Sequence, residues 1–321
     1  TTCSVLTLLP EGAVCAHIGD SRIYRLTQNR IEQLTFDHSL VWEMKFAGQL
    51  SEEEERLGKI PKNVITRSLG PYAECNVDLE GPFPIQVGDT FLLCSDGLTG
   101  VISDTEIGSI LANMSPDEAV KVLVDLANLR GGPDNITAVI VKIGHPKLAT
   151  SGNHSTGTST RGSSSSKPLV PATFWGVFIG SAIVTILLYF LGFWQISLFT
   201  GVVSLAALGY LVSCLIKNSF QGQHAGTGQV LGKGTYVRLG CASSGQFAKQ
   251  LADMLRKLQE GALRENWKVD WPQLKSMTNK AEQATSQEDH STAIANYGRA
   301  VSFLMDQLRN QEDASSSSIE L

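Results

Sequence analysis

Three aspartates in the first half of the sequence have the residue type and placement that divalent-cation chemistry requires. Asp20, Asp96 and Asp134 each adjoin a strand-like apolar run, and each lies next to glycine or proline. Carboxylates at strand ends can converge at one rim of a sheet, and Mg²⁺ and Mn²⁺ prefer such oxygen ligands. Taken singly, an aspartate beside glycine or proline is also common turn chemistry. The three residues alone therefore leave a metal centre and three ordinary turns both open.

Other chemistries find little support in the composition. The six cysteines show no CxxC and no pairing rhythm, which suits a reducing compartment and offers no zinc site. None lies in a Cys-x5-Arg loop, which argues against phosphate transfer through a cysteine nucleophile. A net charge of −5 and a pI of about 5.7 give a nucleic-acid partner no electrostatic support.

The elements that must position these aspartates are predicted from local patterns over residues 1–145. Strand-like runs occupy 2–8, 13–18, 22–26, 74–79, 90–94 and, as a buried strand, 136–143; an exposed helix is predicted within 39–58. Ser103 with Glu106, and Ser115 with Glu118, form capping boxes that begin two further helices. Strand and helix blocks of this kind predict a layered α+β domain.

A Ser/Thr/Gly-rich segment and two uncharged apolar runs follow. Residues 146–170 are too polar to bury a core and are predicted to be a flexible linker. The runs at 172–193 and 196–216 are each long enough to cross a hydrocarbon core about 30 Å thick. Their tight spacing predicts a transmembrane helical hairpin within 171–217, with a buried hairpin of a soluble protein as the alternative. Arg161, Lys167 and Lys217 favour a cytoplasmic position for both flanking parts.

The last region, 218–321, is predicted to be a cytoplasmic helical tail. An amphipathic rhythm predicts a helix over 247–263, and 280–304 suggests two antiparallel helices. This pair resembles a single tetratricopeptide-type unit, but such repeats normally need about three copies. An ordinary helical hairpin therefore remains an alternative. Residues from Asp313 onward are predicted to be disordered.

Five ordered motifs identify a family resemblance over residues 1–145. They are GDSRIYR at 19–25, LTFDHS at 34–39, TRSLG at 66–70, LLCSDGLTGVIS at 92–103 and GGPDNITAVIV at 131–141. Together they closely resemble the metal-dependent protein phosphatases (the PPM, or type 2C, family) in their bacterial form. The resemblance implies part of an α-β-β-α sandwich. The related environmental-stress and sporulation branch is a weaker match, because TRSLG and GGPDN speak against it.

The resemblance also implies roles for individual residues. Asp96 and Asp134 match the ligands of a dinuclear Mn²⁺ or Mg²⁺ centre, and Asp20 matches the ligand of a weaker third ion. Asn135 and Gly97 are similar to residues that support these ligand loops. Residues 39–62 fall where the family has a mobile flap. A further set within the motifs is interpreted as mainly structural: Arg22, Asp37, His38 and Arg67.

The implied reaction is hydrolysis of phosphoserine or phosphothreonine by a metal-bridged water, without a covalent intermediate. The implied partners are phosphoproteins, among them membrane-proximal kinases, and the lipid bilayer. A tether beside the membrane would raise the local concentration of such substrates. The alternative is a catalytically inactive membrane scaffold with a phosphatase-like domain.

The beginning of the sequence departs from the family pattern. The family opens with a segment that carries a phosphate-binding Arg and an Asp-Gly-Met-Gly-Gly stretch. Neither occurs in this sequence, which begins at Thr1. The sequence is therefore interpreted as an N-terminally truncated fragment whose catalytic Arg lies in the missing segment. Such a fragment alone is expected to bind metal poorly and to be close to inactive.

Overall fold

The computed structural model describes residues 1–51, 54, 60–61, 64–71, 74–150 and 231–317, without the side chains of 312–317. The chain divides into two compact units, Thr1–Ser151 with Gly228–Leu321, and Gly152–Thr227. All described residues belong to the first unit. The predicted membrane hairpin and most of the predicted linker lie outside the described residues. Within the described part, no helix is long and apolar enough to span a membrane.

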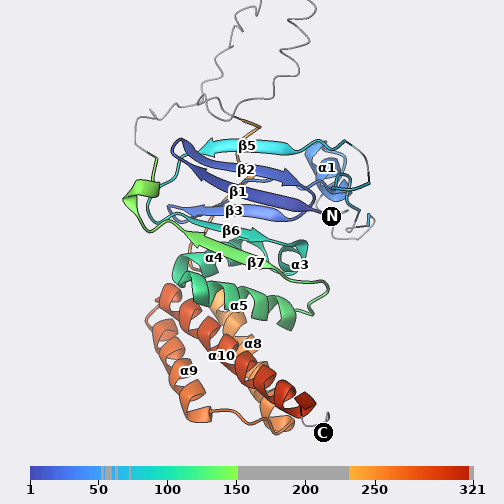
Figure 1. Ribbon diagram of the computed structural model, residues 1–321. Coiled ribbons are helices and arrows are strands. Elements are labelled where there is room, and N and C mark those ends of the chain that lie inside the picture. The colour runs from blue at the N-terminus through green and yellow to red at the C-terminus, as the bar shows by residue number, and fades with distance from the viewer. Residues whose placement is uncertain (52–53, 55–59, 62–63, 72–73, 151–230, 318–321) are drawn as a thin grey trace, which may run out of the picture. The chain divides into compact units, whose positions relative to one another are not determined.

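Eight strands and eight helical segments make up the described structure (Figure 1). The strands are β1 (Cys3–Leu9), β2 (Gly12–Ile18), β3 (Arg22–Thr27), β4 (Arg30–Gln33), β5 (Asp78–Phe83), β6 (Thr90–Cys94), β7 (Ala138–Lys142) and β8 (Val237–Gly240). The helices are α1 (Leu40–Phe46), α3 (Asp96–Thr99), α4 (Asp104–Asn113), α5 (Pro116–Leu129), the 3₁₀ turn η1 (Pro146–Leu148), α8 (Gly245–Arg264), α9 (Trp271–Ser286) and α10 (His290–Ser317).

Two antiparallel sheets form the centre of this unit. One has the order β1-β2-β5, and the other has the order β7-β6-β3-β4-β8. A small apolar cluster joins them: Ala13, Cys15, Ile23, Leu34, Phe83, Ile85, Phe91 and Ile143. Ala13 and Cys15 are two residues apart on β2, so both side chains face the cluster, as the two-residue period of a strand requires.

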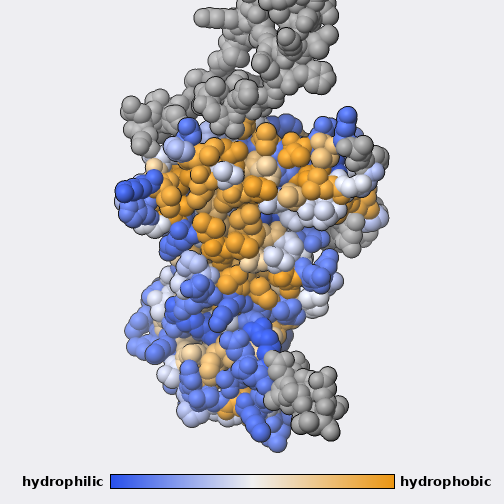
Figure 2. Space-filling view, in the orientation of Figure 1, coloured by the Kyte–Doolittle hydropathy of each residue, from blue (hydrophilic) through white to orange (hydrophobic). Residues whose placement is uncertain are grey.

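Helices cover the five-stranded sheet in two further layers. Figure 1 shows α4 and α5 beside this sheet, and α8, α9 and α10 beyond them. One continuous core runs through these layers, from Tyr24 and Leu92 in the sheet through Leu123 on α5 to Ile294 and Val301 on α10. The three-stranded sheet differs, because Val5 and Leu79 on it are 46% and 38% exposed. Figure 2 shows the corresponding apolar surface over the strands.

Local sequence signals account for the best-predicted elements. Both capping boxes form, with Glu106 bonded to Ser103 and Glu118 bonded to Ser115. Pro116 opens α5, where its missing N–H costs nothing because that donor would have no helical partner. The predicted apolar face of α5 is fully buried: Ala119, Val122, Leu123, Leu126 and Ala127.

Several predictions of elements were wrong in position or extent. The run at 136–143 is not a buried strand, because β7 is an edge strand on which Val139 is 52% exposed. The strand predicted at 74–79 lies at Asp78–Phe83. β4 and β8 were not predicted at all. Helix α10 extends through Ser317, past the point where disorder was predicted.

The boundaries of the first domain also differ from the prediction. The predicted linker begins at 146, yet the backbone N–H of Thr150 donates to Ile85 O at 3.0 Å, so the structured domain includes 146–150. The predicted tail is not separate: its described residues belong to the same compact unit as residues 1–150. Ion pairs and strand pairing, described below, join the two.

Candidate functional site

A pocket of about 540 Å³ opens where several strand ends meet. All three candidate metal ligands, Asp20, Asp96 and Asp134, line it. The other lining residues are Arg22, Asp37, Ser39, Val41, Trp42, Lys45, Gly97, Thr99, Gly100, Asp104, Pro133 and Val237. Residues from four of the five motifs, all but TRSLG, therefore line one cavity, although these motifs are spread over residues 19–141.

Strand register explains why the three aspartates meet. Arg22 pairs with Cys94 across β3 and β6, and Cys94 pairs with Ala138 across β6 and β7. The start of β3, the end of β6 and the start of β7 therefore lie at the same end of the sheet. Asp20 lies just before the first of these points, Asp96 just after the second and Asp134 just before the third.

The loops that carry Asp96 and Asp134 are locked together by Ser95. Its hydroxyl donates to Asn135 O at 3.0 Å and accepts from the backbone N–H of Thr137 at 2.9 Å. Its backbone N–H donates to Thr137 O at 3.0 Å. The backbone N–H of Asn135 donates to Asp134 Oδ1 at 2.7 Å, which fixes the orientation of that carboxylate. The contacts of Asn135 with these loops are made by its backbone.

Gly97 permits the close approach of these two loops. A Cβ at this position would lie 2.6 Å from Asn135 O and 3.2 Å from Asp134 O. Real Cβ atoms do not approach carbonyl oxygens so closely, so any side chain would push the Asp134 loop away. The glycine of the SDG motif is therefore required by packing against the other aspartate loop.

The third aspartate is held through the peptide of Gly19, whose φ is +118°. The backbone N–H of Gly19 donates to His38 Nδ1 at 3.0 Å, and its carbonyl oxygen accepts from His17 Nε2 at 2.9 Å. His38 Nε2 in turn contacts Asp78 Oδ2 at 2.9 Å. Two buried neutral histidines thus hold the peptide that precedes Asp20. Burial lowers the pKa of both, and that of His17 falls to about 4.

The acidic side of the pocket brings carboxylates close enough to repel one another. The pKa of Asp20 is raised, first by burial and then by the negative charge of Asp96, with Asp134 adding to it. Among the described residues, no Lys or Arg forms an ion pair with any of the three aspartates. A bound cation would relieve this repulsion.

The three aspartates have the right donor atoms for a hard divalent ion, but they are too few and too far apart to form a complete ligand set. Carboxylate oxygens are the donors that Mg²⁺ and Mn²⁺ prefer. Within the described ranges, however, no group of three or more His, Cys, Asp or Glu side chains is close enough to hold a metal ion. Asp20, Asp96 and Asp134 share the pocket without forming a complete ligand set.

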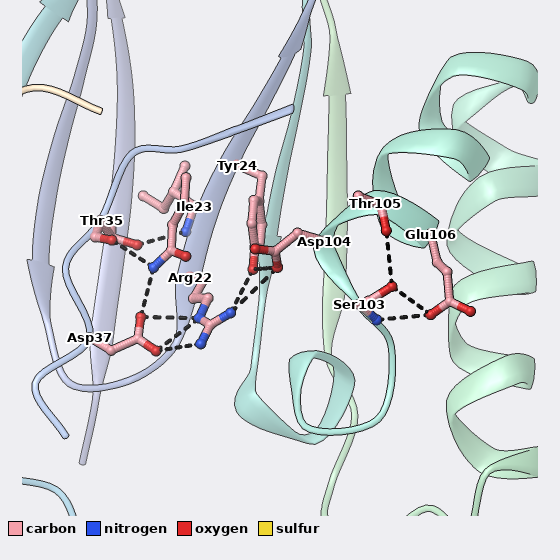
Figure 3. Close-up of polar contacts among 10 residues, drawn as sticks. Arg22, Ile23, Tyr24, Thr35, Asp37, Ser103, Asp104, Thr105 and Glu106 are labelled. Atoms are coloured by element: carbon pink, nitrogen blue, oxygen red, sulfur yellow. Dashed lines mark hydrogen bonds and ion pairs between the residues drawn. The ribbon is translucent and has the colours of Figure 1, made fainter. Parts of the chain in front are cut away.

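Arg22 and Asp37 form a closed polar network on another side of the pocket (Figure 3). Arg22 donates to Asp37 Oδ2 from Nε at 2.9 Å and from Nη2 at 2.7 Å, and its Nη1 donates to the Tyr24 hydroxyl at 2.8 Å. Tyr24 donates to Asp104 Oδ1 at 2.7 Å. Each of its three nitrogens thus has a partner, which agrees with the mainly structural interpretation of Arg22.

The remaining motif residues also have structural partners. Arg67 donates to Asp78 Oδ1 at 2.7 Å, and Asp78 contacts His38, which is fully buried. This chain of contacts runs from the TRSLG motif to the Gly19 peptide. It agrees with the structural interpretation of Arg67 and His38.

Sequence reasoning missed several residues of the pocket. Trp42 and Val41 come from α1, within the segment interpreted only as a flap, and Val237 comes from the C-terminal region. Asp104, the first residue of α4, was not singled out at all. Val237 lies far from the motifs along the chain, and no local pattern marks it.

Sequence comparison identifies relatives of this chain. A putative protein phosphatase 2C-type of Streptococcus pyogenes is 44% identical over 142 residues, which are 44% of this chain and 57% of the relative. Protein phosphatase PhpP of Streptococcus pneumoniae is 44% identical over 144 residues, 58% of its length. The serine/threonine phosphatase stp of Listeria welshimeri is 41% identical over 143 residues, 56% of its length. The relatives of this chain are protein phosphatases.

The extent of the match is partial on both sides. The chain spans less than three fifths of the length of these phosphatases. No family model matches the sequence. Among solved structures, the serine/threonine phosphatase of S. agalactiae is 39% identical over 44% of this chain and 58% of that one, with a TM-score of 0.40. Identity to the phosphatase sequences, and not this structural overlap, supports the relationship.

Proposed function

We propose that residues 1–145 form part of the catalytic pocket of a metal-dependent serine/threonine protein phosphatase. The observation that carries the proposal is the gathering of Asp20, Asp96 and Asp134 in one pocket, where no described Lys or Arg forms an ion pair with them. The three residues come from motifs of a segment that is about 40% identical to protein phosphatases. The inactive scaffold is less well supported, because these relatives are named as phosphatases.

In this proposal Asp96 and Asp134 bind the two principal Mn²⁺ or Mg²⁺ ions, and Asp20 with Asp96 binds a third. Bound ions of this kind supply a water of lowered pKa and offset charge on a phosphoryl group. The chain's own contribution is positioning. Ser95 and Gly97 hold the Asp96 loop against the Asp134 loop, and His17 and His38 fix the peptide before Asp20.

The proposed substrates are phosphoserine and phosphothreonine residues of proteins, including membrane-proximal kinases. The named relatives include serine/threonine phosphatases, which supports this choice. Cys15 and Cys94, at the sheet, are buried, and burial raises their pKa values to about 12. Thiols in that state are poor nucleophiles at neutral pH.

Metal binding to the full chain tests the pocket directly. Titration of Mn²⁺, followed by the electron paramagnetic resonance of the free ion, is expected to show weak binding. The Asp96→Asn variant should weaken it by more than about tenfold, because a charged ligand becomes a neutral one. Asp253→Asn, an exposed acid on α8, is the matched control and should leave binding unchanged. Equal Mn²⁺ binding by wild type and Asp96→Asn would contradict the proposal.

A hydrolysis assay tests whether the pocket of this chain is a complete or a partial catalytic site. With p-nitrophenyl phosphate and Mn²⁺, the 321-residue chain alone is expected to be close to inactive, because three aspartates do not complete a ligand set. Measurable hydrolysis that is lost in Asp96→Asn would show that the chain alone is catalytically sufficient. Mn²⁺ bound by the aspartates without hydrolysis agrees with a partial catalytic pocket.

We further propose that the runs at 172–193 and 196–216 anchor the protein in a membrane, with both flanking parts in the cytoplasm. The support is their length and lack of charge. Flotation with phosphatidylcholine vesicles tests this. The full chain should float with the vesicles, and a variant in which a Gly/Ser linker replaces 172–216 should not. If both behave alike, the anchoring proposal is wrong.

A further inference from the structure

A short segment between the predicted hairpin and the helical tail lies against both sheets. We call residues 231–240 the C-terminal strap. At its start, Leu231 pairs with Gly81 of the three-stranded sheet. At its end, β8 pairs antiparallel with β4, with Glu32 opposite Arg238 and Gln33 opposite Val237. The strap therefore covers the edge of β4, which would otherwise expose unpaired backbone groups.

The strap is anchored on a buried carboxylate, that of Glu80 on β5. Only 3% of Glu80 is exposed. Glu80 Oε2 accepts from the backbone N–H groups of Lys233 at 2.9 Å and Gly234 at 3.0 Å, and Oε1 accepts from the Tyr236 hydroxyl. Successive backbone N–H groups in a glycine-rich loop form a concavity suited to an anion. All these donors come from the strap, so a displaced strap would leave Glu80 buried without them.

Two glycines shape this loop in different ways. Gly232 has φ +68°, and a Cβ there would lie 2.0 Å from Glu80 Oε2. Gly234 has φ +94°, and a Cβ there would meet nothing within 4 Å. Both positions favour glycine for backbone reasons. Only Gly232 must also be glycine for the strap to close on Glu80.

The strap reaches the candidate site through an aromatic cluster. The Tyr236 ring lies 5.3 Å from that of Phe36, which lies 5.6 Å from Trp42 and 5.4 Å from Phe46. Lys233 Nζ lies 5.2 Å from the centre of the Phe46 ring. Trp42 and Phe46 belong to α1, and Trp42 lines the pocket. Next to Tyr236, Val237 lines the pocket itself.

We propose that the C-terminal strap is a positioning element for the pocket. Seated on Glu80, it fixes α1 through Tyr236 and supplies Val237 as part of the pocket wall. The pocket has the form described here only while the strap is docked. The five phosphatase motifs end at residue 141, so this wall comes from a part of the chain that those motifs do not include. Residues beyond the phosphatase-like part thereby decide the shape of its site.

Amide hydrogen exchange of the full chain in detergent micelles tests the positioning role without requiring metal or activity. Gly232→Ala should raise the exchange rates of α1 and β4 amides by roughly tenfold, because the strap cannot close on Glu80. Gly234→Ala carries similar backbone strain and no clash, so its effect on α1 should be much smaller. Exchange in α9 serves as the internal control and should not change in either variant.

A second measurement tests whether the strap faces the acidic side of the pocket, and it rests on the proposed metal binding. Val237→Asp adds a carboxylate to the pocket and should tighten Mn²⁺ binding several-fold. Leu239→Asp lies on the same strand but not in the pocket lining, so it should leave Mn²⁺ binding unchanged. A merely structural strap would not distinguish these two variants in this way.

The outcomes separate the two proposals. If Gly232→Ala and Gly234→Ala loosen α1 equally, or neither does, the strap does not position the pocket. The same conclusion follows if wild type binds Mn²⁺ and Val237→Asp and Leu239→Asp change its affinity alike. If wild type binds no Mn²⁺, the proposed function fails, and the exchange comparison still decides the role of the strap.

Discussion

Two sets of carboxylates in this protein differ in what faces them. Glu32, Asp37, Glu106 and Asp125 each lie within 2.6–2.8 Å of an arginine. Asp20, Asp96 and Asp134 share a pocket and have no such partner among the residues that the structure describes. Within the described ranges, the fold therefore pairs an arginine with each carboxylate of the first set and with none of the second.

Exposure alone does not explain the difference. Asp96 and Asp134 are exposed, so water can solvate them without a cation. Asp20 is half-buried, and its pKa is raised by that burial and by its acidic neighbours. A half-buried carboxylate beside two others is unfavourable unless a cation joins it. Asp20 is therefore the member of this set whose environment a cation would change most.

The largest expected effect concerns the neutral groups that hold the Asp20 turn. The pKa of His17 is lowered to about 4 by burial, whereas an unfolded chain has a histidine pKa near 6.5. Between these values the unfolded state binds a proton that the native state does not. The free energy of unfolding should therefore fall as pH falls from 6.5 to 4, by about 3 kcal/mol.

Urea unfolding at pH 7 and at pH 4.5 measures this loss. The His17→Gln variant should show less of it, although it is less stable at pH 7 because the bonds to Ser4 and Gly19 are disturbed. His145→Gln, which changes an exposed histidine, is the control and should keep the wild-type pH dependence. An unchanged pH dependence in His17→Gln would show that the Gly19 peptide is not held by a neutral histidine.

The second prediction concerns Gly97, which lies between the loops that carry Asp96 and Asp134. Gly97→Ala places a Cβ 2.6 Å from Asn135 O, in a buried position, and should cost about 2–3 kcal/mol. It should also weaken Mn²⁺ binding, since the Asp96 and Asp134 loops separate. Gly100→Ala, whose Cβ would meet Asp96 O at 3.1 Å, is the milder control. Equal losses of Mn²⁺ binding in both variants would show that Gly97 has no special part in holding the loops together.

The sequence predicted the parts of the fold that depend on neighbours in the chain. Ser103, Ser115 and Pro116 mark helix starts through contacts within one turn, so both boundaries were confirmed. The prediction of a buried strand at 136–143 was wrong, because apolar composition does not distinguish an edge strand from a central one. β7 lies at the edge, and Val139 is exposed there.

Some residues of the candidate site could likewise be predicted from the sequence, and others could not. Asp20, Asp96 and Asp134 could be predicted because each lies in a recognisable motif, and register brings them together. Val237 could not be predicted, because its place in the pocket depends on β8 pairing with a strand about 200 residues earlier. The docking of the tail on α5 is equally invisible in the sequence. It depends on Asp125, an acidic residue that the sequence alone would place at the surface. In the structure Asp125 contacts Ser302 and Arg309.

The carboxylates that are paired with arginine can be tested by removing one of the arginines. Asp125 is 1% exposed and contacts Arg309 Nη1 at 2.8 Å, so Arg309→Leu leaves a buried charge with only Ser302 as partner. We expect a loss of about 2 kcal/mol in urea unfolding, less than for a fully buried pair because Arg309 is partly exposed. Arg256→Leu removes an exposed pair with Asp253 and should change stability by less than about 0.5 kcal/mol. Similar losses in the two variants would mean that Asp125 does not anchor the tail.

The smallest expected effect lies at the exposed end of the same interface. Arg299 on α10 donates to Glu118 Oε1 at 2.8 Å, and the pKa of Glu118 is lowered to about 2, chiefly by this bond. Both side chains are more than one third exposed, so solvent screens the pair and Arg299→Ala should cost less than about 1 kcal/mol at pH 7. The pair stabilises the folded state above the unfolded pKa of Glu118, and this contribution is lost as pH falls from about 4.5 toward 2. Wild type and Arg299→Ala should therefore differ in urea midpoint at pH 7, and the difference should shrink by pH 2.5 without vanishing, because the folded pKa is about 2. A difference as large at pH 2.5 as at pH 7 would show that Arg299 acts through packing and not through the charge of Glu118.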